Sequence, residues 1–130
     1  MPKSSRYIIR FFFEWGGGWL WSGNDAAYTD FDFGPIEGLL PLSQELLDRG
    51  DALSVWHDRS LNWDYPPDPG PWRQDECDRF NAAARAFFAD IQRALGDTFE
   101  VLYQQHDVFE DPDLDEYLKN PRRFQRKQAS

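Results

Sequence analysis

The chain has 130 residues, of which 17% are aromatic and 28% are charged. This length suits one domain with a substantial core, and the aromatic content excludes intrinsic disorder over most of the chain. Residues 1–118 hold all 23 acidic residues and carry a net charge of −14, whereas residues 119–130 carry +5. A negative field repels nucleic acid and anionic lipid, so we expect neither as a partner. The same field attracts a basic protein surface, which is the partner that we expect.

The N-terminal residues, the length of the apolar stretches and the single cysteine indicate the cellular compartment of the protein. The N-terminal apolar run is short, is broken by Arg10 and lacks a small-residue cleavage site. No stretch reaches the length needed to cross a bilayer. The single cysteine, Cys77, cannot form an internal disulfide and fits a reducing environment. We therefore expect a cytoplasmic protein.

The N-terminal residues predict an antiparallel β-hairpin. Residues 6–14 are β-branched and aromatic, the glycines at 16–18 form a turn, and residues 19–22 return as a second strand. Such a hairpin would set Trp15 near Trp19 across the strands. Strand alternation predicts that one set of side chains faces the core: Tyr7, Ile9, Phe11 and Phe13.

The middle of the chain predicts a loop, a helix and a second loop. Residues 23–41 are rich in Gly, Pro and Asp and predict a loop with one short apolar insert. Ser43 is a good N-cap for a helix that runs to about Arg59, although Gly50 weakens this helix or divides it in two. Residues 62–73 contain four prolines, which exclude a regular helix or an inner strand.

The second half of the chain predicts the longest helix and a late strand. From Gln74 to Leu95 apolar residues recur at i+3 and i+4, and Gly96 stands at the C-terminal cap position. Residues 98–103 predict a strand that pairs with the hairpin. The fold class is therefore α+β: a single domain over residues 1–118 with a hairpin, two main helices and a late third strand, followed by a basic, flexible tail over residues 119–130.

The acidic residues cluster near the end of this domain. Residues 97–116 contain eight Asp or Glu and no Lys or Arg. Apolar side chains are interleaved with them, and an interface needs both, because charge gives rate and specificity while buried aromatics give affinity. A solvated edge is the alternative. The candidate partner-binding residues lie within residues 107–117, which we call the acidic segment: Asp107, Phe109, Glu110, Asp111, Asp113, Asp115, Glu116 and Tyr117.

The proline-rich loop and the basic tail are two further candidate surfaces. The aromatic residues of the proline-rich loop, Trp63, Tyr65 and Trp72, form a second candidate surface, or cap the core and hold the loop to the domain. The basic tail either folds back onto the acidic face or solubilises the end of the chain, because strong nucleic-acid binding is improbable for a chain with this net charge.

The sequence offers no metal, cofactor or catalytic motif. Asp111, Asp113 and Asp115 match the opening of an EF-hand loop, but Glu116 stands where the turn requires Gly and Arg122 where a bidentate Glu is required. His57 and His106 belong to no metal-ligand pattern, and Cys77 fits the apolar stripe of its helix. The glycines at 16–18 form no phosphate loop. We therefore expect no cofactor and no enzyme activity.

Three segments carry a resemblance to known proteins: FFFEWGGGWLWSGNDAA, LPLSQELL and LNWDYPPDPGPWRQDECDRFNAAARAFF. Over about residues 10–101 the chain resembles small acidic bacterial proteins of the type of immunity proteins encoded beside polymorphic toxins, including those of contact-dependent growth inhibition. The resemblance implies a cytoplasmic protein that binds and blocks one cognate toxin domain, often a basic nuclease. It transfers no site residues.

These observations predict an immunity protein that neutralises a cognate basic toxin domain by stoichiometric occlusion. A nucleic-acid-mimicking inhibitor of a DNA-binding protein is an alternative within the same class. A small enzyme is the alternative from another class, and a subunit whose aromatic surface is covered by its own copy is a third.

Overall fold

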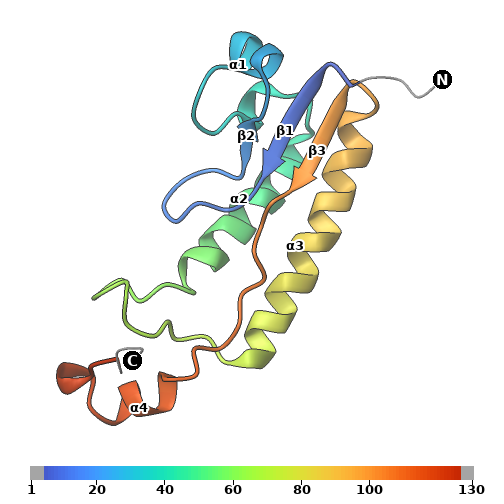
Figure 1. The fold of residues 1–130 in the computed structure, drawn as a ribbon. Coiled ribbons are helices and arrows are strands. Elements are labelled where there is room, and N and C mark those ends of the chain that lie inside the picture. The colour runs from blue at the N-terminus through green and yellow to red at the C-terminus, as the bar shows by residue number, and fades with distance from the viewer. Residues whose placement is uncertain (1–4, 127–130) are drawn as a thin grey trace.

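The computed structural model describes residues 5–126 and contains a three-stranded sheet in the order β2-β1-β3. Strand β1 (Tyr7–Phe11) pairs antiparallel with β2 (Leu20–Ser22) and parallel with β3 (Phe99–Tyr103). Figure 1 shows β1 between its two neighbours. The N-terminal hairpin and the late third strand are confirmed, and the fold is α+β.

Helix α2 (Gln44–Asp58) passes behind β1 in Figure 1, helix α3 (Gln74–Leu95) runs beside β3, and the two helices pack against each other. Beyond β3 the chain runs away from the sheet toward α4 (Leu114–Lys119). The helical elements are α1 (Asp25–Phe31), the 3₁₀ turn η1 (Glu37–Leu39), α2 (Gln44–Asp58), α3 (Gln74–Leu95), α4 (Leu114–Lys119) and the 3₁₀ turn η2 (Pro121–Arg123). Both predicted main helices are confirmed. The Ser43 hydroxyl accepts from the Leu46 N–H, and Gly96 ends α3 with a φ of +73°.

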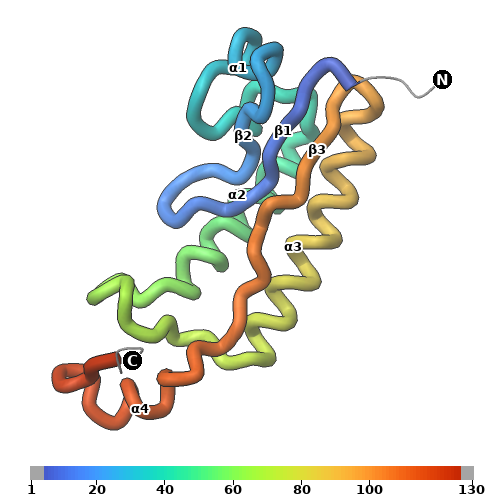
Figure 2. The backbone as a smooth tube through the Cα atoms, in the orientation of Figure 1, coloured from blue at the N-terminus to red at the C-terminus, as the bar shows by residue number. Residues whose placement is uncertain are grey.

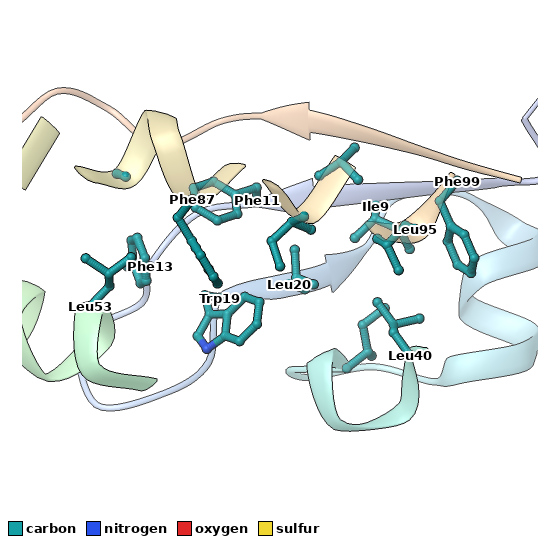
Figure 3. Close-up of a cluster of buried hydrophobic side chains, with 14 of the residues drawn as sticks. Ile9, Phe11, Phe13, Trp19, Leu20, Leu40, Leu53, Phe87, Leu95 and Phe99 are labelled. Carbon is teal, nitrogen blue, oxygen red and sulfur yellow. The ribbon is translucent and has the colours of Figure 1, made fainter. Parts of the chain in front are cut away.

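The core lies between the sheet and the two long helices (Figure 3). Ile9 and Phe11 are fully buried and Phe13 nearly so, as strand alternation predicts. The ring of Phe87 on α3 packs against Trp19 at 5.1 Å and Phe11 at 6.0 Å between ring centroids. Burying several large aromatic side chains contributes roughly 2–3 kcal/mol each, so this cluster is a main source of the stability of the fold.

Gly50 does not divide α2, which is continuous from Gln44 to Asp58. The glycine is buried where the helix crosses Trp19, and a Cβ atom added there would lie 2.2 Å from Trp19 Cζ2. The absence of a side chain lets the indole approach the helix backbone. Close packing therefore explains a glycine whose helix propensity alone argues against a continuous helix.

Two expectations about the N-terminal third were wrong. Residues 23–41 are not one loop, because Asn24 caps α1 by accepting from the Ala27 N–H at 3.0 Å, and Ala27 is buried in the core. Trp15 does not pair with Trp19. Its ring stacks on His57 with centroids 4.9 Å apart, whereas Trp19 points into the core.

A row of polar side chains on α3 holds β3 and the chain that follows it. At the edge of the sheet, Gln92 accepts from Val101 N–H and donates to the Phe99 carbonyl, both at 3.0 Å. Three turns earlier on the same helix, Asn81 donates to the Val108 carbonyl and accepts from its N–H, both at 2.8 Å. This second pair fixes the extended chain of residues 104–113, which Figure 2 shows running antiparallel to α3.

Candidate functional site

The acidic residues of the acidic segment are matched by cations of the same chain. Arg73 lies 2.8 Å from Asp115 and 3.6 Å from Glu110, measured between side-chain nitrogen and oxygen atoms. The remaining pairs are Arg85 with Asp107 at 2.8 Å, Arg126 with Asp111 at 2.6 Å and with Asp113 at 2.9 Å, and Lys119 with Glu116 at 3.3 Å. The segment is therefore much closer to neutral than its sequence suggests.

These ion pairs are solvent-exposed, and exposed pairs contribute only about 0–1 kcal/mol each. Arg126 makes the most extensive contacts: its guanidinium bridges Asp111 and Asp113, and its Nε donates to the Pro67 carbonyl at 3.0 Å. This guanidinium holds the pKa of Asp111 below its usual value. Lys119 and Arg126 of the basic end thus contact the acidic segment, as in the fold-back arrangement. Flexibility of residues 119–130 stays a prediction, and Lys127 lies outside the described residues.

Of the two apolar anchors predicted in the segment, only one is open. Phe109 is 72% exposed. Tyr117 is half-buried, its hydroxyl accepts from Asn62 Nδ2 at 3.0 Å, and its ring packs edge-on against Phe124. Phe109 is therefore available to a partner as the structure stands, whereas Tyr117 is engaged in holding α4 to the proline-rich loop.

Phe109 lies on the wall of a pocket of about 690 Å³, which we call the aromatic pocket. Three segments meet there: the end of β1 with the turn after it, the C-terminal end of α2, and the extended chain after β3. Its volume is within the range of ligand pockets in proteins. The lining residues are Arg10, Phe12, Phe13, Trp15, His57, Ser60, Gln104, Gln105, His106, Asp107, Val108 and Phe109.

The inner wall of the pocket is a stack of rings. Trp15, which is 45% exposed, lies on His57, and His57 lies 5.7 Å from the Phe13 ring centroid. The Trp15 indole N–H points to the Ser60 hydroxyl at 3.4 Å, and the Gly16 N–H donates to Asp58 Oδ1 at 2.9 Å. The turn of the hairpin is thus fastened to the end of α2, which fixes the exposed indole in place.

His57 is buried with an exposed fraction of 2%, and its Nδ1 has no hydrogen-bond partner among the described residues. Burial lowers the pKa of His57 from 6.5 to about 4, with Asp58 opposing the shift. The imidazole is therefore neutral at pH 7 and forms part of an apolar wall. His57, which belongs to no metal-ligand pattern in the sequence, is thus a structural histidine of the core.

Several polar residues at the rim of the pocket are already paired with other residues of the chain. Arg10 Nε donates to Gln104 Oε1 at 2.7 Å, and its guanidinium lies over the Phe12 ring. Gln105 Oε1 accepts from the Phe13 N–H at 2.8 Å, and Asp107 is held by Arg85. Phe12 in turn stacks on Trp21 of β2, so half-buried apolar surface continues from the pocket onto the sheet.

The aromatic residues of the proline-rich loop divide between surface and core. Trp72 is 5% exposed and packs on Phe80 and Trp56, so it caps the core. Trp63 and Tyr65 are 58% and 59% exposed. The Trp63 indole N–H donates to the Asp58 carbonyl at 2.6 Å, which attaches its exposed ring to the same end of α2 that carries His57.

The structure brings Asp107 and Phe109 into the aromatic pocket, and it places the other predicted residues of the acidic segment further along, beside the N-terminus of α3 and the proline-rich loop. Sequence reasoning missed Trp15 and His57 as pocket residues. A signal existed for His57, because it follows Leu53 by four residues on one helical face, and both are buried.

Other kinds of site are not found in residues 5–126. No group of three or more His, Cys, Asp or Glu side chains there is arranged to hold a metal ion. No helix in that range is long and apolar enough to cross a membrane. Cys77 is buried on α3, and burial raises the pKa of its thiol, which makes it a poor nucleophile.

Comparison with known proteins places this chain in a family. Curated protein sequences gave no match to the chain. The family model described as Serratia CdiI immunity protein-like matches residues 8–106, which contain the sheet, α2, α3 and the aromatic rings Trp15 and His57 of the pocket. Because the match spans most of the 130 residues, the chain belongs to the Serratia CdiI immunity protein-like family.

Proposed function

We propose that this protein neutralises a cognate toxin domain by binding it stoichiometrically, with the aromatic pocket at the centre of the contact. Membership of an immunity protein family carries the first half of this proposal. The central position of the pocket is supported by its exposed Trp15 and Phe109, which lie on segments fixed by hydrogen bonds to α2 and α3. Large aromatic side chains at the centre of an interface supply most of its binding energy.

The finer proposal is that the toxin domain is basic, such as a nuclease, and that the protein acts in the cytoplasm. The net charge of −9 supports a basic partner, because opposite charges raise the rate of association. In this proposal inhibition comes from covering the toxin's substrate site by bulk and charge, and no turnover is involved. Arg10, Gln105 and Asp107 of the pocket are engaged in structural pairs, which favours binding over catalysis for these three residues.

The acidic segment enters the proposal as the outer part of the same surface. Asp107 and Phe109 reach the pocket, and Glu110 to Glu116 lead away from it. Because their intrachain pairs are exposed and weak, arginine or lysine side chains of a toxin can replace Arg73 or Arg126 at low free-energy cost. The exposed rings of Trp63 and Tyr65 form the second candidate surface, attached to the same helix end.

The test begins with capture of the partner from a lysate of the source organism on the tagged protein, with elution by a salt step. The captured toxin, once purified and assayed for its own activity, is then titrated with this protein. We expect inhibition that is complete at an equimolar ratio, and Phe109→Ala to weaken binding by about tenfold or more, the effect of losing a central aromatic contact.

Phe33→Ala is the matched control, because Phe33 is 78% exposed and stacks only on Tyr28 among ring partners in the described chain. It should leave the affinity unchanged. Inhibition at a small fraction of the toxin concentration would show catalysis and refute occlusion. Retention of no basic protein at low salt would refute the proposed partner class.

A further inference from the structure

Within the proposed interface the aromatic pocket and the acidic surface have different chemistry. The walls of the pocket present rings from three separate segments: Phe12 and Phe13, Trp15, His57 and Phe109. The one carboxylate among its lining residues, Asp107, lies 2.8 Å from the Arg85 guanidinium. A lysine or arginine entering the pocket would therefore find no free negative charge among these residues.

The other charge at the rim also disfavours a cation. Arg10 lines the pocket and keeps its guanidinium over the Phe12 ring. The cation–π position on that ring is thus already taken by a side chain of this protein. A second cation in the pocket would be repelled by Arg10 and would lose hydration, with only the exposed ring faces of Trp15 and Phe109 to offset that loss.

The geometry points to an aromatic side chain of the toxin as the occupant of this pocket, with the basic residues of the toxin bound outside it, along the acidic segment. This inference rests on the proposed function for the identity of the partner. A ring fits because it buries a large apolar area and can stack or meet the wall rings edge-on, which adds about 0.5–1.5 kcal/mol per ring pair beyond the area itself. Trp15 is already held in place by Ser60 and His57, so little ordering of the pocket is required on binding.

The experiment uses the full chain without the toxin. N-acetyl-tryptophanamide and N-acetyl-argininamide are titrated separately at millimolar concentrations, and binding is followed by two-dimensional ¹H–¹⁵N NMR. We expect the tryptophan amide to shift the Trp15 indole N–H and the backbone amides of residues 104–109 in a saturable way. Intermolecular NOEs should connect its indole to the Phe109 and Trp15 rings. The arginine amide should produce none of these effects.

Phe109→Ala should weaken binding of the tryptophan amide at least fivefold, and Phe33→Ala should leave it unchanged. Equal or tighter binding of the arginine amide in the pocket would overturn the inference, and so would saturation with neither probe. Toxin inhibition on the same variants separates the two proposals. Equimolar inhibition without indole binding refutes only the aromatic occupant. Indole binding by a protein that retains no toxin refutes the proposed function, and of the inference it leaves only the preference of the pocket for an aromatic ring.

Discussion

Two single residues illustrate how the core decides what the local sequence leaves open. Gly50 lets Trp19 approach the backbone of α2, and an added Cβ would also lie 2.9 Å from the Phe87 ring. His57 lies on the buried face of α2 with Gly50 and Leu53, a position that a hydrophobic side chain ordinarily occupies. Its ring nitrogen Nδ1 has no hydrogen-bond partner in the described structure. Substituting Gly50 or His57 should therefore change the free energy of unfolding differently from what the residue type alone predicts.

Gly50→Ala should destabilise the protein by about 1–3 kcal/mol, the typical cost of overpacking a core. Helix propensity alone predicts the opposite sign, a gain of about 1 kcal/mol. Chemical denaturation measures the free energy of unfolding of each variant. Gly38→Ala in η1 is the control, because an added Cβ there meets no atom within 4 Å. If Gly50→Ala were as stable as the parent chain, the close approach of Trp19 would be wrong.

His57→Phe should remove an acid-dependent loss of stability. The pKa of His57 is about 4 in the folded chain against 6.5 as the ordinary value, so below pH 6.5 the unfolded chain takes up a proton that the folded chain does not. This group therefore reduces the free energy of unfolding as the pH falls from 6.5 toward 4, by about 2 kcal/mol at pH 5.

Urea denaturation of the parent and His57→Phe at pH 7 and pH 5 measures that difference. The substitution keeps a ring against Trp15 and Phe13, and the drop in stability between the two pH values should shrink by about 2 kcal/mol. Phe33→Ala, which changes an exposed side chain and no titratable group, should leave the drop as it is. An unchanged pH dependence in His57→Phe would show that the imidazole is accessible to protons in the folded chain.

At the scale of elements, α3 does more than bury an apolar stripe. Gln74, Asn81, Arg85 and Gln92 follow one another along its length, and each bonds the strand or extended chain beside it. Gln92 occupies backbone groups at the free edge of β3, which limits pairing with a second chain. Asn81 and Arg85 hold residues 107 and 108, and thereby one wall of the aromatic pocket.

Asn81→Ala should release that wall. The substitution removes two hydrogen bonds to the Val108 backbone, which should cost about 1–3 kcal/mol of stability. Hydrogen exchange read by NMR should show faster exchange of the Val108 amide. Gln44→Ala is the control, because within residues 5–126 the Gln44 side-chain amide bonds only to the exposed Asp48. The stability of this variant should stay within about 0.5 kcal/mol of the parent. Unchanged protection of Val108 in Asn81→Ala would contradict this role of α3.

At the scale of the whole molecule, pairing within the chain redistributes the charge. The acidic segment is largely matched by its own cations, whereas other carboxylates, such as Glu45 on α2 and Asp75 on α3, have no ion-pair partner within residues 5–126. The net charge of −9 therefore acts as a diffuse field around the molecule. Such a field raises the rate of encounter with a basic partner more than it strengthens the final contact.

The rate constant for association with the captured toxin should accordingly fall by about tenfold or more when salt is raised from low to high ionic strength, while the dissociation rate constant changes much less. Stopped-flow mixing or surface plasmon resonance measures both constants. An association rate that does not depend on salt would show that the acidic charge has no part in recognition.

The sequence by itself determined the α+β class, the hairpin, both long helices and the late strand, because alternation, helical spacing and the caps at Ser43 and Gly96 are local signals. It also predicted Phe109 and Asp107 at a binding surface, which stays a proposal. Only the tertiary structure decided that Arg73, Arg85 and Arg126 would offset the acidic segment, and that Trp15, His57 and Phe109 would meet around one pocket. Residues tens of positions apart meet only through the packing of strands and helices, and no local pattern encodes that meeting.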